Sequence, residues 1–431
     1  MPLADAPSAA FFESNRRRLA EAMKPKSLAV VNNNDVFPTN ADGSMSLHPS
    51  ADLYYLTGID QEESILVFFP DAFEEKNRAI LFLRETSELI QTWEGEKLTK
   101  ADAERISGVK RVEWLGEFST IFHALMCEAD HVYLNSNDHP RAKVVVETRE
   151  ARFVRDCLER YPLHEYHRLS RIMYRLRSVK SEPELALIRK ACGITRDGFA
   201  RVAKFVRPGV NERNVEAEFD HEFRSQGGQF AYTPIVASGI NACALHYIKN
   251  NCECRDGDLL LLDVAAAYGH YNSDLTRTIP VNGRFTKRQR QVYDAVLRVH
   301  RACLKELKPG VTAKDWRAFA QQETEKELVD LKLLTTAEVR DQGPDKKALN
   351  KYFMHGIGHS IGLDVHDVQI VDAPVTAGWV MTCEPAIYIR DEGFGIRIED
   401  TVLVTESGGV TLMPDIPIEA DAIEELMASR G

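Results

Sequence analysis

The sequence predicts two domains, an α/β domain followed by an α+β domain whose second half repeats the layout of its first. The chain has 431 residues, which is long for one domain and ordinary for two. Strand candidates alternate with helical segments before residue 170, and beyond it a helical block is twice followed by a strand-rich block. We therefore place the domains at residues 1–170 and 171–431.

The composition is that of a globular chain, with 44% hydrophobic and 28% charged residues and a net charge of −11. The longest basic run is Arg16–Arg18, so we expect no nucleic-acid partner. No apolar run is long enough to span a membrane, and Met1–Asn15 lacks the order of a signal peptide. Eight scattered cysteines are typical of reduced thiols. These features predict a cytoplasmic protein that binds no membrane.

The first domain begins with an amphipathic helical segment at residues 12–24. Short apolar runs bounded by polar or turn residues then predict five strands. These are Ser27–Asn32, Ser64–Phe69, Ala79–Leu83, Val109–Trp114 and His131–Asn135. Helical segments are expected between them, for instance at residues 100–106 and 117–128.

The second domain follows the charged stretch Arg171–Glu184. Ser181 is placed as an N-cap and Pro183 fits a first turn, so a helix is expected over 185–205. Helices to about residue 226 precede the first strand-rich block, and a helical block at Lys287–Leu334 precedes the second, at 353–413. The polar stretch 335–349 separates them.

Two carboxylates fall on a predicted hairpin in the first strand-rich block. Strand candidates Leu259–Ala265 and Ser273–Val281 flank a turn at Tyr268–Gly269. A hairpin centred there sets Asp263 directly opposite Asp274, with both side chains on one face.

A second hairpin is predicted near the C-terminus. Strand candidates Val380–Ile389 and Phe394–Val404 flank a turn centred on Asp391–Glu392, which sets Glu384 opposite Glu399. Arg397 lies two residues before Glu399 and shares its face. Four carboxylates gathered on one surface require protonation, pairing with Arg or Lys, or metal cations, and two divalent ions would balance their charge.

Histidines for such a site lie in the glycine-rich segment Phe353–Asp367, at His355, His359 and His366. The His-x-x-x-His spacing does not make a zincin helix, because Gly356 replaces the catalytic Glu and Gly358 disfavours a helix. We expect the backbone of this glycine-rich segment to pass close to a site whose other residues lie on strands. His246 lies in a further turn-like region, Ala244–Tyr247.

Five local strings resemble those of the M24 "pita-bread" metallopeptidases. They are Leu-Asp-Val at 262–264, Ser-Asp-Leu-Thr-Arg-Thr at 273–278, His-Gly-Ile-Gly-His-Ser-Ile-Gly at 355–362, Cys-Glu-Pro at 383–385 and Ile-Arg-Ile-Glu-Asp at 396–400. The resemblance implies a catalytic domain with duplicated halves and five metal ligands in this order: Asp263, Asp274, His359, Glu384 and Glu399.

The first domain indicates which group of M24 enzymes the chain resembles. Residues 49–58 (Pro-Ser-Ala-Asp-Leu-Tyr-Tyr-Leu-Thr-Gly) and the string Trp93–Gly95 resemble the creatinase/aminopeptidase P-like N-terminal domain. The chain therefore resembles Xaa-Pro aminopeptidases, which release the first residue of peptides with proline in second position. Prolidase, which cleaves Xaa-Pro dipeptides, shares the ligands and stays an alternative. A non-catalytic pita-bread binding module is the alternative of another class.

The resemblance also implies a mechanism. Two divalent metal ions, manganese before cobalt or zinc, are bridged by Asp274 and Glu399 and hold the attacking hydroxide. Glu384 carries the proton to the leaving nitrogen. Around them, the resemblance places catalytic groups at His246, His355, His366 and Arg397 and substrate-binding groups at Tyr388 and Trp93. The counterpart of Trp93 reaches a neighbouring subunit in some family members, so the resemblance implies a homodimer or homotetramer.

Overall fold

The computed structural model describes residues 6–41, 43–139, 142, 145–343, 347–370 and 373–429. The start of the segment Met1–Asn15 and residues 344–346 of the polar stretch therefore lie outside the described residues. The chain divides by its contacts into two compact units, Met1–Arg177 and Ser178–Gly431. The predicted boundary, between residues 170 and 171, falls at the start of helix α7 (Ser170–Ser178).

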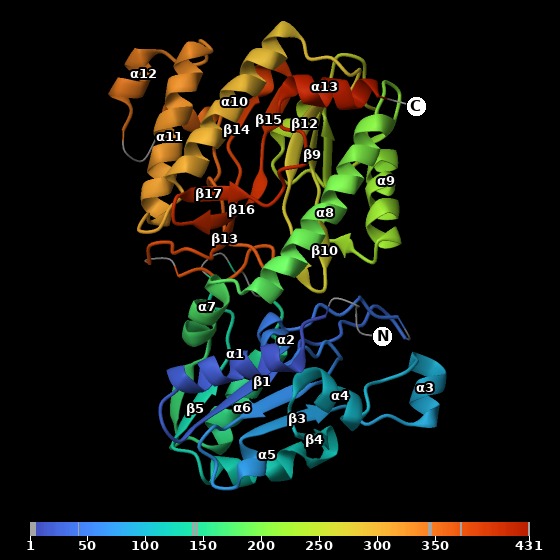
Figure 1. The fold of residues 1–431 in the computed structure, drawn as a ribbon, viewed down its shortest axis with the longest axis vertical. Coiled ribbons are helices and arrows are strands. Elements are labelled where there is room, and N and C mark those ends of the chain that lie inside the picture. Colours follow the sequence, from blue (N-terminus) through green and yellow to red (C-terminus); the bar gives the residue numbers. More distant parts are fainter. Residues whose placement is uncertain are drawn as a thin grey trace. The chain divides into compact units, whose positions relative to one another are not determined.

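The N-terminal unit is built on one mixed sheet with the strand order β4-β3-β2-β1-β5-β6 (Figure 1). Its five predicted strands are all present, and the sixth, β6, was not predicted. The strands are β1 (Ser27–Asn32), β2 (Ile65–Phe68), β3 (Ala79–Leu83), β4 (Arg111–Trp114), β5 (His131–Leu134) and β6 (Glu165–Arg168). Neighbours β1–β2 and β2–β3 are antiparallel, and the other three pairs are parallel.

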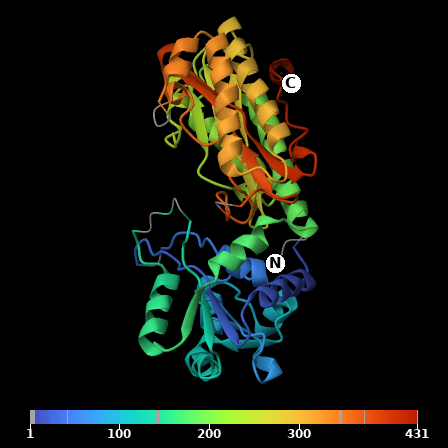
Figure 2. The same cartoon turned by 90° about the vertical axis from the view of Figure 1, so that its left-hand side faces the viewer.

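Helices cover this sheet, with α6 on one side of it and α1 on the other (Figure 2). They are α1 (Ala9–Ala22), α2 (Ala51–Thr57), α3 (Glu88–Glu94), α4 (Lys100–Ser107), α5 (Phe118–Met126), α6 (Arg149–Arg160) and α7. A hydrophobic core joins strand residues such as Val30 and Val67 to Phe122 and Leu125 of α5. This predicted α/β layer is confirmed.

The C-terminal unit repeats one layout twice, two long helices followed by antiparallel strands. The first half has α8 (Glu182–Phe205), α9 (Glu212–Ser225), β7 (Gln229–Phe230), β8 (Ile235–Ser238), β9 (Leu259–Asp263), β10 (Ala266–Tyr268), β11 (Tyr271–Asn272) and β12 (Thr276–Pro280). The second has α10 (Lys287–Glu306), α11 (Ala313–Asp330), α12 (Thr336–Asp341), β13 (Val380–Cys383), β14 (Ala386–Ile389), β15 (Phe394–Arg397), β16 (Asp400–Thr405), β17 (Gly408–Thr411) and the closing helix α13 (Ala420–Ala428). The predicted α+β arrangement with duplicated halves is confirmed.

Local sequence sets where the helices of this unit begin. Ser181 and Glu184 form a capping box at the start of α8, and Pro183 occupies its first turn, as predicted. Thr286 and Gln289 form the same box at the start of α10. In both views α10 lies beside α11 (Figures 1 and 2).

The strands of the two halves meet at one bridge, between Thr276 at the start of β12 and Glu399 just before β16. Their backbones exchange hydrogen bonds of 3.3 and 3.0 Å. This contact brings the acidic residues of the two halves together.

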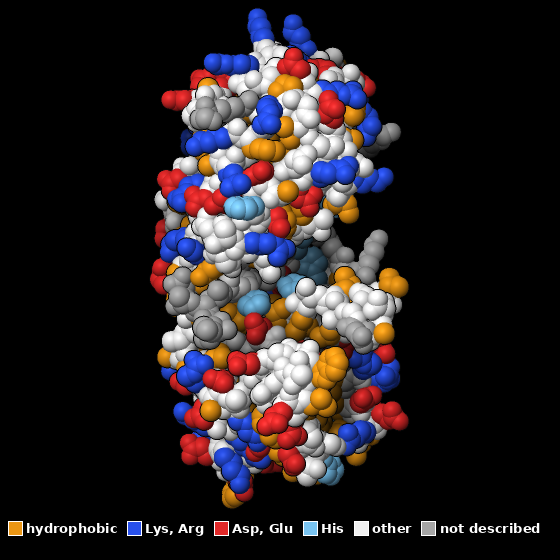
Figure 3. Space-filling view, turned by 90° about the vertical axis from the view of Figure 1, so that its right-hand side faces the viewer, with side chains coloured by type: hydrophobic (Ala, Val, Ile, Leu, Met, Phe, Trp, Pro, Cys, Tyr) orange, Lys and Arg blue, Asp and Glu red, His pale blue; other side chains and the backbone are white. Residues whose placement is uncertain are grey.

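Among the described residues, no helix has both the length and the apolar composition needed to cross a membrane. On the face drawn in Figure 3, basic and acidic side chains are interspersed, and the residues coloured there form no wide area of basic charge alone.

Candidate metal centre

Asp263 and Asp274 lie on one face of the first hairpin, although not directly opposite each other. Asp263 pairs with Thr276, because the turn lies at Gly269 and His270, one residue later than predicted. Both turn residues have positive φ, 56° and 66°. Asp274 itself lies between β11 and β12.

The predicted register was therefore wrong by two residues. A two-residue hairpin turn of this kind needs positive φ at both central positions. The predicted turn would have forced Tyr268, a bulky aromatic residue, into that conformation. A shift of two residues keeps a side chain on its face of the sheet, so the expectation that both carboxylates share a face is met.

The register predicted for the second hairpin is confirmed. Cys383 pairs with Asp400 between β13 and β16, and Ala386 pairs with Arg397 between β14 and β15. Glu384 lies between β13 and β14, and Glu399 lies between β15 and β16. In the register of the flanking pairs these two residues stand opposite each other.

The glycine-rich histidine segment runs along β13. The Thr382 N–H donates to the His359 carbonyl at 2.8 Å, and the His359 N–H donates to Thr382 Oγ1 at 3.1 Å. A Cβ at Gly358 would lie 2.1 Å from the Thr382 carbonyl oxygen. Glycine is therefore what permits the close approach that the sequence predicted.

Three predicted ligands converge. One ligand atom from each of Asp274, His359 and Glu399 lies within 4.8 Å of the others. His359 Nε2 is 3.5 Å from Asp274 Oδ2, and their side chains are 12% and 6% exposed. Asp274 and Glu399, more than one hundred residues apart in the sequence, thus meet with His359 in a single cluster.

Arg397 connects a third carboxylate, that of Asp263, to this cluster. Its Nη2 donates to Asp263 Oδ2, and its Nε donates to Thr276 Oγ1 at 3.1 Å. The Thr276 hydroxyl in turn donates to Glu399 Oε2 at 2.7 Å. Asp263 and Glu399 are thus linked through the Arg397 guanidinium and the Thr276 hydroxyl.

Tyr232 is a site residue that the sequence analysis missed. Its hydroxyl donates to Asp274 Oδ1 at 2.7 Å and also interacts with Asp263. Burial, followed by the charges of three carboxylates, raises the Tyr232 pKa well above its usual value, so the phenol stays a donor. Tyr232 stands outside any strand or helix and belongs to no repeating pattern, so no sequence signal marked it.

Glu384 faces a second group of side chains. His355 Nδ1 is 3.5 Å from Glu384 Oε2. The same nitrogen lies 2.7 Å from the Gly356 carbonyl, and His355 Nε2 lies 2.9 Å from the Tyr388 hydroxyl. Arg397 Nη1 donates to that hydroxyl at 2.7 Å, so the Tyr388 proton points to His355. Burial, with Arg397 adding, lowers the His355 pKa to about 3, and the ring is neutral.

The carboxylates cannot all be ionised without compensating charge. Burial raises the pKa of Glu384 to about 7, with Asp274 and Asp263 adding to the shift and His359 and Arg397 opposing it. Burial and the neighbouring carboxylates also raise the pKa of Glu399. One arginine offsets one of four negative charges. The oxygen-rich donor set with a single imidazole therefore fits divalent cations.

The remaining predicted residues are not among the three whose ligand atoms converge. The His366 ring centroid is 4.0 Å from that of His359, and His366 is exposed. His246 is exposed and follows the short 3₁₀ helix Gly239–Cys243. Trp93 belongs to the other unit, on α3, and is 81% exposed.

Two family descriptions match the chain. Residues 186–406 match the metallopeptidase family M24, and residues 12–133 match the N-terminal domain of aminopeptidase P. The Xaa-Pro aminopeptidase of Escherichia coli K12 is 32% identical over 440 residues, covering 97% of both chains.

Solved structures agree over the full length. A putative aminopeptidase P from Bacillus anthracis superposes with a TM-score of 0.90 at 31% identity, covering 99% of both chains. A zinc-substituted aminopeptidase P of E. coli in complex with product gives a TM-score of 0.87 at 32% identity, again covering 99% of both chains.

Proposed function

The chain belongs to metallopeptidase family M24 as a metal-dependent Xaa-Pro aminopeptidase, and from this we propose that one dinuclear centre in its C-terminal unit carries the activity. The convergence of Asp274, His359 and Glu399 within 4.8 Å is the observation that carries the proposal. The proposed ligands are Asp263, Asp274, His359, Glu384 and Glu399, which together would hold two divalent ions.

We propose manganese as the metal, with cobalt or zinc able to replace it, because four of the five donors are carboxylates. Bound ions of this kind lower the pKa of a coordinated water and polarise the substrate carbonyl. The chain's own residues then set positions and move protons. Arg397 and Thr276 hold Asp263 and Glu399, and Tyr232 holds Asp274 from the opposite side.

Glu384 is the proposed proton carrier from the attacking water to the leaving proline nitrogen. Without bound metal, burial raises the pKa of this carboxyl to about 7, and a positioned carboxyl can act as a general acid–base group. His355 lies on its other side and is held neutral. The exposed imidazoles of His246 and His366 are the proposed donors to the substrate carbonyl oxygen.

The proposed substrate is a peptide with proline in second position. Its tertiary amide has no N–H, so the ring and not a donor is recognised there. The match of residues 12–133 to the N-terminal domain of aminopeptidase P favours this substrate over the Xaa-Pro dipeptides of prolidase. Incubating the manganese-loaded protein with Xaa-Pro-Yaa and Xaa-Pro peptides tests the choice. We expect release of Xaa from the tripeptide; cleavage of the dipeptide alone would favour prolidase.

The ligand set is tested separately by Glu399→Ala. We expect this variant to lose bound manganese and turnover together, whereas Glu406→Ala, at an exposed glutamate, keeps both. Full metal content with an unchanged rate in Glu399→Ala would contradict the assignment. Neither manganese nor turnover in the wild-type protein would favour the non-catalytic module.

We further propose that the catalytic domain begins near residue 171, that the protein is cytoplasmic and that it forms a homodimer or homotetramer. The eight cysteines are all free, which supports a reducing compartment. The exposed Trp93 supports contact of α3 with a neighbouring copy. Light scattering on the purified chain gives its mass, and a monomer would rule out the assembly.

A further inference from the structure

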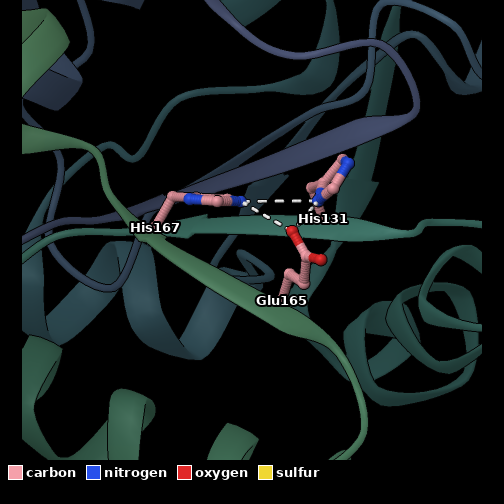
Figure 4. A group of neighbouring side chains, drawn as sticks. All are labelled: His131, Glu165 and His167. Atoms are coloured by element: carbon pink, nitrogen blue, oxygen red, sulfur yellow. Dashed lines mark hydrogen bonds and ion pairs between the residues drawn. The ribbon is translucent and has the colours of Figure 1, made fainter.

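A second group of metal-ligating side chains lies in the N-terminal unit and shares no residue with the proposed metal centre. His131 is on β5, and Glu165 and His167 are on the edge strand β6. The parallel register pairs His131 with Glu165 and Tyr133 with His167. All of these side chains therefore share one face of the sheet, where the two imidazoles and the carboxylate point toward one another (Figure 4).

The distances between the three donor atoms are those of ligands around one ion. His131 Nδ1 lies 3.0 Å from Glu165 Oε2 and 3.4 Å from His167 Nε2, and His167 Nε2 lies 3.7 Å from Glu165 Oε2. Three ligands about 2.1 Å from a tetrahedral zinc ion stand roughly 3.4 Å apart. We propose that His131, Glu165 and His167 form a binding site for Zn²⁺, with water in the remaining position.

The chemistry of the group supports an ion over a purely hydrogen-bonded cluster. Two imidazole nitrogens that face each other share at most one proton, and the same carboxylate oxygen faces both rings. A divalent ion at the centre satisfies all three donors at once.

Zn²⁺ is the choice because imidazole and carboxylate together suit it. The side chains of His131 and His167 are 21% and 25% exposed and that of Glu165 is 65% exposed, so an ion can enter from solvent. A bound ion ties β6 to β5 by side chains and strengthens the edge of the sheet. Lys24 Nζ lies 3.4 Å from Glu165 Oε2 and competes with the ion for this carboxylate.

Zinc stoichiometry tests the site. The full chain is stripped with chelator, dialysed against micromolar Zn²⁺ and analysed for metal, beside the double variant His131→Ala/His167→Ala. A second double variant, His48→Ala/His123→Ala, removes two exposed imidazoles of the same unit and serves as the control. We expect the first to bind one equivalent less than wild type and the control to equal it. Equal zinc in all three proteins would overturn the proposal.

Two single substitutions at exposed positions keep the test independent of folding. Glu165→Gln keeps the shape but removes the charged ligand, so we expect at least tenfold weaker binding of the additional Zn²⁺ equivalent. Lys24→Ala removes the competing cation, so we expect tighter binding of the same equivalent. Both measurements use zinc titrations of proteins that retain peptidase activity, since the catalytic ligands lie in the other unit. Unchanged titrations in both variants would refute the site.

Discussion

At the scale of single residues, the hydroxyl of Thr276 connects an arginine to a proposed metal ligand. It accepts from Arg397 Nε and donates to Glu399 Oε2, at 3.1 and 2.7 Å. Thr276→Val keeps the volume and leaves both partners without this contact. Groups that orient ligands in this way typically contribute about 10–100-fold to metal affinity or activity. We expect a loss of that size in manganese affinity, measured by titration calorimetry.

Thr278→Val is the matched control for that substitution. Thr278 lies two residues further along β12 on the same face, and its hydroxyl donates to the Arg397 backbone carbonyl at 3.2 Å. The control has the same chemistry and the same burial, but its hydroxyl bonds to the Arg397 backbone, whose N–H donates to it at 3.2 Å, instead of to a carboxylate. Equal losses of manganese affinity in the two variants would show that the Thr276 hydroxyl does not position Glu399.

The pKa of Glu384 predicts how metal binding depends on pH. Burial first, and then Asp274 and Asp263, raise the metal-free pKa to about 7. Below pH 7 the protonated Glu384 carboxyl must release its proton before it can bind an ion, so apparent affinity falls as the pH is lowered through 7. Calorimetry in buffers of different ionisation enthalpy counts the protons. We expect release at pH 6 to exceed release at pH 9, and equal counts would contradict the raised pKa.

At the scale of elements, the histidine segment is positioned by glycine. Gly358→Ala would place a Cβ 2.1 Å from the Thr382 carbonyl oxygen of β13. The backbone must move there, and with it the adjacent His359. We expect destabilisation of about 1–3 kcal/mol, as for overpacking in a core, together with loss of bound manganese. Chemical denaturation and metal analysis measure the two effects.

Gly356→Ala is the control within the same segment, since the nearest atom to its Cβ would be the Gly358 nitrogen at 4.0 Å. Neither glycine is among those with positive φ, so backbone strain does not separate them. If both substitutions cost the same stability, close packing of Gly358 on β13 is not what positions His359.

The two hairpins show where counting residues outward from a turn predicts the strand pairing correctly and where it does not. The turn before β15 ends at Gly393, which has a φ of 77°. Counting residues outward from this turn correctly predicted that Glu384 stands opposite Glu399. The first hairpin puts His270 at positive φ, which few non-glycine residues adopt, so the pattern favoured the wrong pair. Tyr232 reaches Asp274 from irregular chain, where no period exists.

Short or polar elements were missed for a related reason. Strand β6 reads Glu-Tyr-His-Arg and lies at a sheet edge, so it lacks the apolar run that marks a buried strand. Helix α2 spans only Ala51–Thr57, too short for a helical period to be recognised. Long helices such as α8 and α10 and buried strands such as β1 and β12 carry their own signal, and these were predicted, whereas the amphipathic helix α6 was not.

At the scale of the whole molecule, the two units have separate tasks and separate cores. Every residue proposed to hold manganese lies within Ser178–Gly431, while the hydrophobic core around Val30 and Phe122 belongs to Met1–Arg177. A ligand that binds only the folded state stabilises it by about 2.7 kcal/mol at one hundred times its dissociation constant. Only those segments that must open for the ligand to leave are stabilised by this free energy.

Hydrogen exchange of the full chain with and without manganese therefore distinguishes the units. We expect peptides covering β9–β12, residues 353–367 and β13–β16 to exchange more slowly in the presence of the metal, because these segments carry the proposed ligands. Peptides from the sheet of the N-terminal unit are expected to keep their rates, since manganese has no proposed ligand there. Glu399→Ala should abolish the effect. Slowing confined to the N-terminal unit, or unaltered by Glu399→Ala, would place the manganese somewhere other than the proposed centre.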